Sequence, residues 1–202
     1  MSPSHEGPSS HSKLTTDVQQ NEFTPEERSI LLKLAREAIV STLEKQEVSL
    51  QSPSSHLAEP RGVFTTIRLH GVLRGCVGFV FPVASLYRNV IETARSAAFA
   101  DTRFPPVTRE EASQLAVDLS ILSPLSPIAP EEIEIGRHGL LITMAGHRGL
   151  LLPQVPVEYG WDRIAFLEQT CRKAGLPLDA WKNVATIEAF TAEIFGDQDA
   201  QS

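Results

Sequence analysis

The stretch from Leu73 to Gly78 reads Leu-Arg-Gly-Cys-Val-Gly and combines residue types that can do chemistry. It places Cys76, one of two cysteines, two positions after Arg74 and between two glycines. A positive charge beside a thiol favours the nucleophilic thiolate, and glycine within a strand marks the close approach of another backbone or of a ligand. The motif therefore predicts a nucleophilic thiol, with Arg74, Gly75 and Gly78 holding an anionic group. Burial of Cys76 as a small apolar filler is the alternative.

Asp101 and Arg103 form a second polar group, on a loop that Pro105 and Pro106 stiffen. Polar side chains on such a loop can face a cleft. There Arg103 would help Arg74 to hold the anion, and Asp101 would orient Arg103. A local carboxylate–guanidinium clamp with a structural role is the alternative.

The histidines offer candidates for proton transfer. His138 lies in a glycine-flanked turn and could act as a general base toward a thiol or hydroxyl, as could His147. Their spacing does not place either one beside the cysteine, and turn histidines are commonly solvated. His70 is accounted for by a predicted turn and His56 by a loop.

Cys76 and Cys171 lie far apart and form no CxxC spacing, so the sequence predicts neither a zinc ribbon nor a disulfide framework. We expect no metal site, and no motif identifies a cofactor. The amino terminus lacks the basic and apolar regions of a signal peptide, and no run approaches the roughly 18 apolar residues of a membrane span. These features predict a cytoplasmic protein that does not enter a membrane.

The composition narrows the class of protein. Of 202 residues, 42% are hydrophobic and 21% charged, which is typical of one compact unit with a substantial core. The net charge of −7 gives no electrostatic footprint for duplex nucleic acid or an anionic membrane surface. Walker, GxGxxG, HExxH and GxSxG motifs do not occur in the sequence, so phosphate cradling, zinc proteolysis and α/β-hydrolase chemistry have no support.

The elements that must position these residues begin after a polar leader. Residues 1–22 are rich in Ser, Pro, Gln and His, which predicts disorder. Thr24 can then cap a helix of about 20 residues, with Pro25 at its first position and Glu27 completing a capping box. Residues 63–69 follow as a predicted strand, with a two-residue hairpin turn at 70–71.

That turn sets the expected register of the hairpin. Ile67 would pair with Arg74, and Thr65 with Cys76, so that Arg74 and Cys76 point to the same face about 7 Å apart. The hairpin would then display the two functional groups together on one side of the sheet.

The remaining pattern predicts a helix over 82–100, a short capped helix from Thr108 with Glu111, and a strand over 116–122. Short apolar runs after 133 predict hairpins, and a helix over 161–174 places Cys171 on its core side. A final strand is expected over 186–195, and 197–202 as a disordered tail. We therefore predict an α+β fold, with a mostly antiparallel sheet flanked by helices.

The ordered motifs resemble one family, the AMMECR domain family, and within it the bacterial branch called AmmeMemoRadiSam system protein A. The resemblance spans most of 23–195. Position 77 holds Val where the family usually has Ile. The motifs that carry the resemblance lie at 73–78, 101–106, 136–140, 150–154 and 171–176.

The resemblance implies an AMMECR-type domain over 23–196. Its larger part would come from both ends of the chain and its smaller part from an internal segment, with a cleft between them. The Leu-Arg-Gly-Cys motif is the suspected functional site of the family. Its members are often encoded beside a Memo-like protein and a radical SAM protein, which implies a shared system.

Three hypotheses of function remain open. The chain is a component of that system with an anion-binding or thiol-based site, and in an enzyme version it acts on a small anionic substrate through Cys76, His138 and Asp101. Alternatively it is a non-catalytic module that docks a Memo-like partner. Nucleic-acid binding is the third hypothesis, which the acidic balance disfavours.

Overall fold

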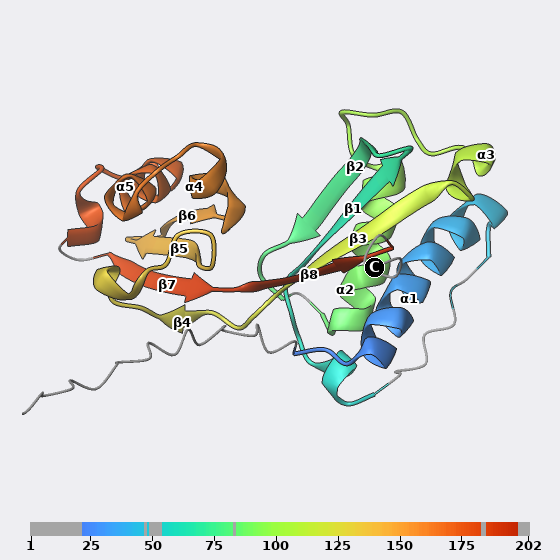
Figure 1. The fold of residues 1–202 in the computed structure, drawn as a ribbon, viewed down its shortest axis with the longest axis horizontal. Helices are drawn as coiled ribbons and strands as arrows, with labels where there is room; N and C mark the ends of the chain where they lie inside the picture. Colours follow the sequence, from blue (N-terminus) through green and yellow to red (C-terminus); the bar gives the residue numbers. More distant parts are fainter. Residues whose placement is uncertain (1–21, 47, 49–53, 83, 183–184, 198–202) are drawn as a thin grey trace, which may run out of the picture.

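The computed structural model describes residues 22–46, 48, 54–82, 84–182 and 185–197. It contains two antiparallel four-stranded sheets, with helices packed against them (Figure 1). The predicted α+β class is confirmed. The predicted leader, apart from Glu22, and the predicted tail, apart from Asp197, lie outside the described residues.

The first sheet has the strand order β2-β1-β3-β8, and the second the order β4-β7-β5-β6. The first comprises β1 (Val63–Leu69), β2 (Val72–Phe79), β3 (Leu115–Leu122) and β8 (Ala192–Gly196). The second comprises β4 (Ser126–Pro127), β5 (Gly139–Met144), β6 (His147–Leu151) and β7 (Thr186–Phe190). We call the first sheet with α1 (Pro25–Glu44), α2 (Leu86–Phe99) and α3 (Arg109–Ala112) the larger lobe. The second sheet with α4 (Gln154–Glu158) and α5 (Arg163–Lys173) is the smaller lobe.

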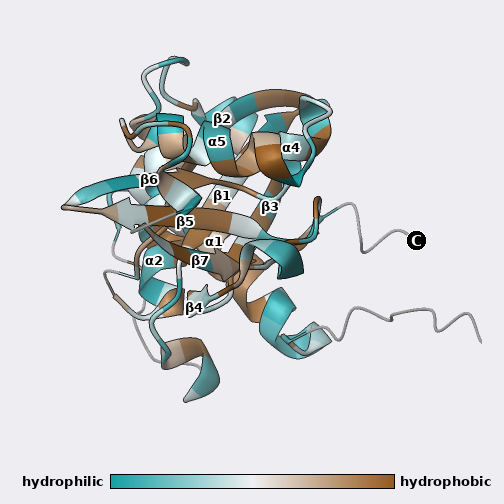
Figure 2. Cartoon of the chain, turned by 90° about the vertical axis from the view of Figure 1, so that its left-hand side faces the viewer, coloured by the Kyte–Doolittle hydropathy of each residue, from teal (hydrophilic) through white to brown (hydrophobic). Residues whose placement is uncertain are grey.

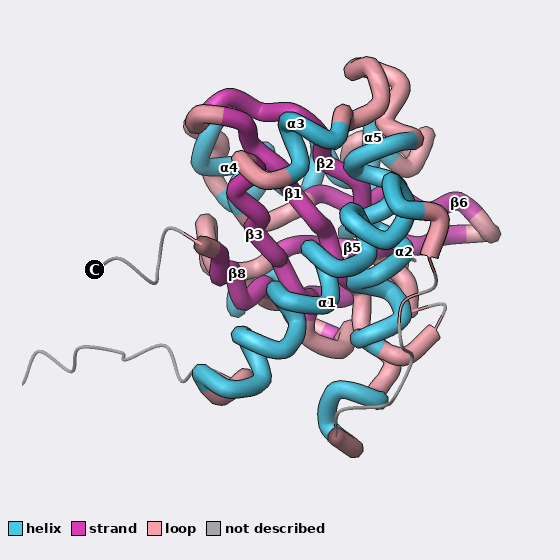
Figure 3. The backbone as a smooth tube through the Cα atoms, turned by 90° about the vertical axis from the view of Figure 1, so that its right-hand side faces the viewer, coloured by secondary structure: helices cyan, strands magenta, loops and turns pink. Residues whose placement is uncertain are grey.

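Helix α1 begins where the sequence predicts it. The Thr24 hydroxyl accepts a hydrogen bond from the backbone of Glu27, and the Glu27 carboxylate accepts one from the backbone of Thr24. The two bonds satisfy donors that a helix start leaves free. The buried side of α1 carries Leu31, Ala35 and Ile39. This side packs with α2 over one face of the first sheet (Figure 3).

Helix α2 starts later than predicted, at Leu86 rather than at residue 82. Ser85 forms an isolated bridge with Pro60, and the backbone of Leu86 donates to Glu59, so these contacts hold Ser85 in an extended conformation. Local sequence favours a helix here, but the neighbouring chain provides other hydrogen-bond partners.

The predicted final strand is two strands that belong to different sheets. β7 ends at Phe190 and β8 starts at Ala192, so the chain passes from the second sheet to the first at Thr191. The hydroxyl of Ser123 accepts a hydrogen bond from the backbone of Thr191 at 3.0 Å, and the backbone of Ser123 donates to the carbonyl of Thr191 at 2.9 Å. The apolar pattern is continuous across the break, and therefore does not reveal it.

The smaller lobe has its own core beneath α5. Phe166, Leu167 and Cys171 are buried against β5, which is hydrophobic along most of its length (Figure 2). The predicted core position of Cys171 is confirmed, and burial raises the pKa of its thiol. The helix stops before Gly175, whose positive φ of 72° fits the predicted helix end.

Glu22 and Asp197, the first and last residues that the structure describes, each have a partner in the larger lobe. The carboxylate of Glu22 pairs with Arg61 at 2.6 Å, and that of Asp197 accepts a hydrogen bond from the backbone of Val117 at 2.7 Å. Both were predicted to be disordered, but each has a charged or backbone partner in the larger lobe. None of the described helices is long and apolar enough to span a membrane.

Candidate functional site

The β1–β2 hairpin contains one residue more on β2 than the predicted register allows. The turn at His70 and Gly71 forms as expected, and Leu69 pairs with Val72. A register shift beside Arg74 follows, and this residue has no partner of its own on β1. Such a β-bulge redirects the side chain that it contains.

Beyond the bulge the predicted pairing is wrong. Ile67 pairs with Gly75 rather than with Arg74, and Thr66, not Thr65, pairs with Cys76. The predicted common face for the arginine and the cysteine is therefore not formed by simple alternation. Each side chain has a different set of neighbours.

Arg74 is directed to α3 and to the loop before it. Its Nε and one terminal nitrogen donate to the two carboxylate oxygens of Glu111 at 3.1 and 3.0 Å. Its terminal nitrogens also donate to the carbonyls of Pro105 and Pro106 at 2.7 and 3.3 Å. The side chain is 11% exposed, and the pairing lowers the pKa of Glu111. Arg74 thus has most of its donors engaged inside the protein.

Asp101 and Arg103 form the clamp that was the structural alternative. Arg103 donates from Nε and a terminal nitrogen to the two oxygens of Asp101 at 2.9 and 2.7 Å. Asp101 accepts from the backbone N–H of Cys76 at 2.9 Å, and Arg103 donates to the Cys76 carbonyl at 3.1 Å. β2 is an edge strand, and the clamp occupies its outward backbone groups.

The charge of Asp101 is stabilised by this arrangement. Hydrogen bonds from the Arg103 guanidinium and from the Cys76 backbone hold the pKa of the Asp101 carboxyl well below its ordinary value of 3.8. The Asp101 side chain is 6% exposed, whereas that of Arg103 is 56% exposed. Of Arg74 and Arg103, it is therefore Arg103 whose guanidinium has an outer edge facing solvent.

We expect the clamp to contribute fully above the ordinary Asp pKa of 3.8 and progressively less below it. A carboxyl with a depressed pKa stabilises the fold above its unfolded-state pKa, and that contribution is lost as the pH falls through the folded-state value. Asp101→Asn should therefore lower the urea midpoint at pH 6, and its difference from the wild type should shrink as the pH falls below 3.8. The exposed Asp179→Asn is the control, with little difference at any pH. A difference for Asp101→Asn that is equal at pH 6 and pH 3 would contradict this prediction.

The two glycines of the motif are explained by close packing. A Cβ on Gly75 would lie 2.0 Å from the carbonyl oxygen of Ala97 in α2. A Cβ on Gly78 would lie 2.3 Å from the ring of Phe64 in β1. The two glycines predicted the close approach of another backbone or of a ligand. A helix backbone approaches Gly75, and an aromatic ring approaches Gly78.

The thiol of Cys76 lies on the face of the first sheet opposite to α1 and α2, which we call the outer face. Across this face, Cys76 pairs with Thr66 and Thr66 pairs with Asp118. The Thr66 hydroxyl donates to the Cys76 sulfur at 3.3 Å, and Arg68 pairs with the Asp118 carboxylate at 3.5 Å. A thiol, a hydroxyl and a carboxylate therefore stand in one row over three strands.

Sequence reasoning missed Thr66 and Asp118, and it identified Glu111 only as a helix cap. Large apolar residues alternate along β3 at 115, 117 and 119, and these are the buried positions. That alternation could have placed Asp118 on the outer face. The partnership of Thr66 with Cys76 depends on the bulge, and that of Glu111 with Arg74 on tertiary packing. Neither has a local signal.

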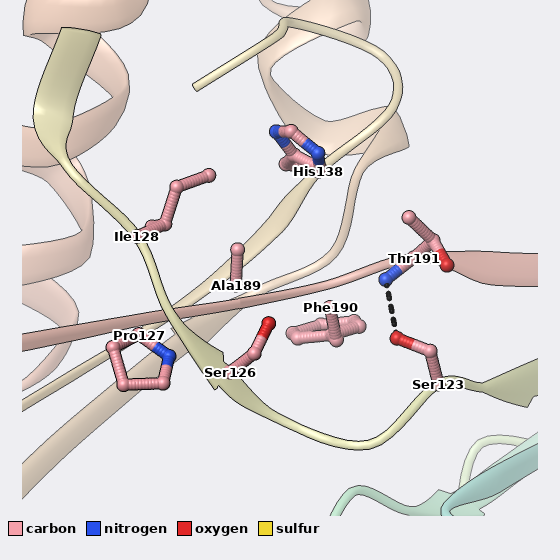
Figure 4. A pocket seen from close by; sticks show the side chains of 8 residues that line it. All are labelled: Ser123, Ser126, Pro127, Ile128, His138, Ala189, Phe190 and Thr191. Atoms are coloured by element: carbon pink, nitrogen blue, oxygen red, sulfur yellow. Dashed lines mark hydrogen bonds between the residues drawn. The ribbon is translucent and has the colours of Figure 1, made fainter. Parts of the chain in front are cut away.

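His138 is in the smaller lobe, at the start of β5, and not beside the thiol. It lines a cavity of about 110 Å³ together with residues of the two connections between the sheets, among them Ser123 and Thr191 (Figure 4). No hydrogen bond joins His138 to Cys76 among the described residues. His147 begins β6 and is exposed. The proton-transfer role expected of His138 at the thiol has no geometric support.

The described residues contain no group of three or more His, Cys, Asp or Glu side chains placed to hold a metal ion. Both cysteines are unbridged, Cys171 in the core and Cys76 half-buried. Within the described part of the chain, the row on the outer face places Cys76 and Asp118 on either side of Thr66.

These features define an α+β protein with two antiparallel sheets, in which an Arg-Gly-Cys hairpin forms the clamped edge of the first sheet. Residues 32–195 match the family described as AMMECR1. The chain belongs to the AMMECR1 family.

Relatives of similar length come from archaea and bacteria. Protein MK0488 of Methanopyrus kandleri is 41% identical, covering 89% of this chain and 92% of its own length. A protein of Aquifex aeolicus is 38% identical, covering 84% of this chain and 92% of its own. The crystal structure of the uncharacterized protein PH0010 from Pyrococcus horikoshii is 42% identical, with a TM-score of 0.70, covering 84% of this chain and 90% of that one.

Proposed function

We propose that this protein is a cytoplasmic, non-catalytic component of a system that also contains a Memo-like protein and a radical SAM protein. In this role it docks the Memo-like protein on the outer face of the first sheet, with the Cys76 thiol at one edge of the contact. The proposal takes the system from the family resemblance and the docking face from the geometry of the hairpin.

The docking role rests on the one group of the motif that is left without a structural task, the Cys76 thiol. Arg74 is engaged by Glu111 and two carbonyls, and the backbone of Cys76 is engaged by the clamp. Neighbouring atoms occupy the space beside Gly75 and Gly78. The thiol is what remains, on a sheet face that neither α1 nor α2 covers (Figure 1).

Apolar surface elsewhere on the outer face supports a macromolecular partner. Ile194, in β8, pairs with Ser120 in β3, which pairs in turn with Phe64. Ile194 is 61% exposed although it belongs to a sheet strand. A flat face with an exposed aliphatic side chain and a half-buried aromatic ring is the surface that protein partners cover.

The test measures binding of the purified Memo-like protein of the same organism by calorimetry. We expect micromolar affinity, weakened at least tenfold by Ile194→Arg on the outer face. Val157→Arg is the matched control, because Val157 is 58% exposed but lies in the smaller lobe. Cys76→Ser should retain binding. Failure of the Memo-like protein to bind at 100 μM, or equal weakening by both arginine variants, would overturn the docking role.

Thiol chemistry is the second candidate, and one contact favours it. The Thr66 hydroxyl donates to the Cys76 sulfur, and a donor to sulfur stabilises a thiolate. Arg103, which contacts the Cys76 carbonyl, has an outer edge facing solvent and could hold an anionic substrate there. Arg74 would then have a structural role and Arg103 the binding role.

Alkylation by iodoacetamide distinguishes this candidate. If the thiol is activated, Thr66→Val should slow the alkylation of Cys76 at pH 7.5 by roughly fivefold, the effect of losing about 1 kcal/mol of hydrogen bonding. Cys171, which is fully buried, is the internal control and should not react in the folded protein. An unchanged rate in Thr66→Val would contradict activation by the hydroxyl.

A further inference from the structure

The cavity beside His138 is built from residues that the docking role does not use. It has a volume of about 110 Å³ and lies where both connections between the sheets pass. Figure 4 shows the His138 ring at one side of it and Ser126 at the other. Its apolar walls are formed by Ile128, Ala189 and Phe190.

One hydrogen bond fixes the tautomer of His138. The backbone N–H of Glu134 donates to Nδ1 at 3.1 Å, and a backbone N–H can only donate, so Nδ1 is the acceptor. The proton of the neutral ring is therefore on Nε2. Burial also lowers the pKa of His138, which agrees with a neutral ring whose Nδ1 accepts a hydrogen bond. The ring offers a ligand one hydrogen-bond donor and no charge.

The charge around the cavity disfavours an anion. No lysine or arginine lines it, and the neighbouring Arg137 is paired with Glu134 at 3.2 Å. The Glu134 carboxylate and the Arg137 guanidinium both lie close enough to act on the His138 ring, with opposite effects on its pKa. The lining gives an anion no cationic partner, so the loss of hydration around a carboxylate or phosphate would be a cost without compensation. A neutral carbonyl oxygen can accept from Nε2 without that cost.

We propose that this cavity binds a neutral acyl amide group. The ligand carbonyl accepts from Nε2 of His138, its amide N–H donates to the hydroxyl of Ser126, and its short alkyl part packs against Ile128, Ala189 and Phe190. The small volume of the cavity suits an acyl group of two or three carbons. The proposal does not depend on the outer face or on its partner.

The experiment follows the His138 ring by NMR in the full-length protein, with ring nitrogens labelled, during titration with propionamide. We expect saturable shifts of the His138 signals with a dissociation constant of about 1–10 mM, as suits a ligand of five non-hydrogen atoms. Sodium propionate has the same shape with a charge, and should bind at least tenfold more weakly. Acetyl-lysine amide, compared with propionamide, distinguishes the source: tenfold tighter binding assigns the cavity to acylated protein side chains, and equal binding assigns it to small amides.

Three variants control the assignment. Ser126→Val fills the cavity at an exposed position and should abolish the shifts without unfolding the protein. His138→Phe removes the donor and should abolish binding detected by propionamide's own signals. His147→Phe changes an exposed histidine of β6 and should leave binding intact. Equal binding of propionate, or propionamide shifts that persist in Ser126→Val, would overturn the proposal.

Discussion

Gly75→Ala should destabilise the protein by at least about 3 kcal/mol, the upper range for inserting atoms into a packed core. The added Cβ would lie 2.0 Å from the carbonyl oxygen of Ala97, and backbone atoms of a helix cannot move aside as the end of a flexible side chain can. Folded domains have net stabilities of about 5–15 kcal/mol, so this single methyl group removes a large fraction. Urea unfolding followed by circular dichroism measures the loss.

Gly71→Ala is the matched control in the same hairpin. Gly71 has a φ of 81°, and a Cβ added to it would have no atom within 4 Å beyond its chain neighbours, so alanine there meets only backbone strain of about 1–2 kcal/mol. Combining Gly75→Ala with Ala97→Gly should restore little, because the clash is with the backbone oxygen. A Gly75→Ala variant no less stable than Gly71→Ala would show that β2 and α2 can separate without cost.

Arg74→Met should cost about 1.5–3 kcal/mol, the range for hydrogen bonds to a charged group, because the pair with Glu111 is only partly buried. The variant leaves the Glu111 carboxylate without its guanidinium and the carbonyls of Pro105 and Pro106 without a donor. The loop at 101–106 would then lose its attachment to β2 on one side. Urea unfolding at pH 7 gives the loss of stability.

A second substitution separates the unpaired charge from lost packing. Arg74→Met combined with Glu111→Gln should recover a large part of the loss, because the amide keeps an acceptor for the α3 cap without a charge. Arg137→Met is the exposed control: its pair with Glu134 is more than half exposed on both sides and should be worth less than about 1 kcal/mol. If Arg74→Met costs no more than Arg137→Met, Arg74 has no structural role.

The elements with local signals could be predicted from the sequence. Helix α1 carries its own cap in Thr24 and Glu27, and the turn at His70 and Gly71 is set by two residues that adopt positive φ. Strand β1 has the predicted bounds 63–69. In each case the residues that decide the structure are neighbours in the chain.

The candidate site could be located from the sequence but not assembled. The motif at 73–78 shows where glycine and cysteine meet, but the bulge beside Arg74 is a property of two strands together, and it shifts every partner beyond it. The separation of Cys76 from His138 is a property of topology, since they belong to different sheets. Spacing along one chain does not contain either fact.

The hydrogen-bonded connection between the lobes at Ser123 and Thr191 has a consequence for the order of folding. These residues are 68 positions apart and are joined by two hydrogen bonds, so the smaller lobe is a closed excursion from the larger one. β3 therefore waits for its neighbour β8 until the whole excursion has been synthesised. Prior folding of the smaller lobe would hold the two ends together, which removes the loop-closure entropy otherwise needed before β3 and β8 pair and so lowers the barrier to completing the first sheet.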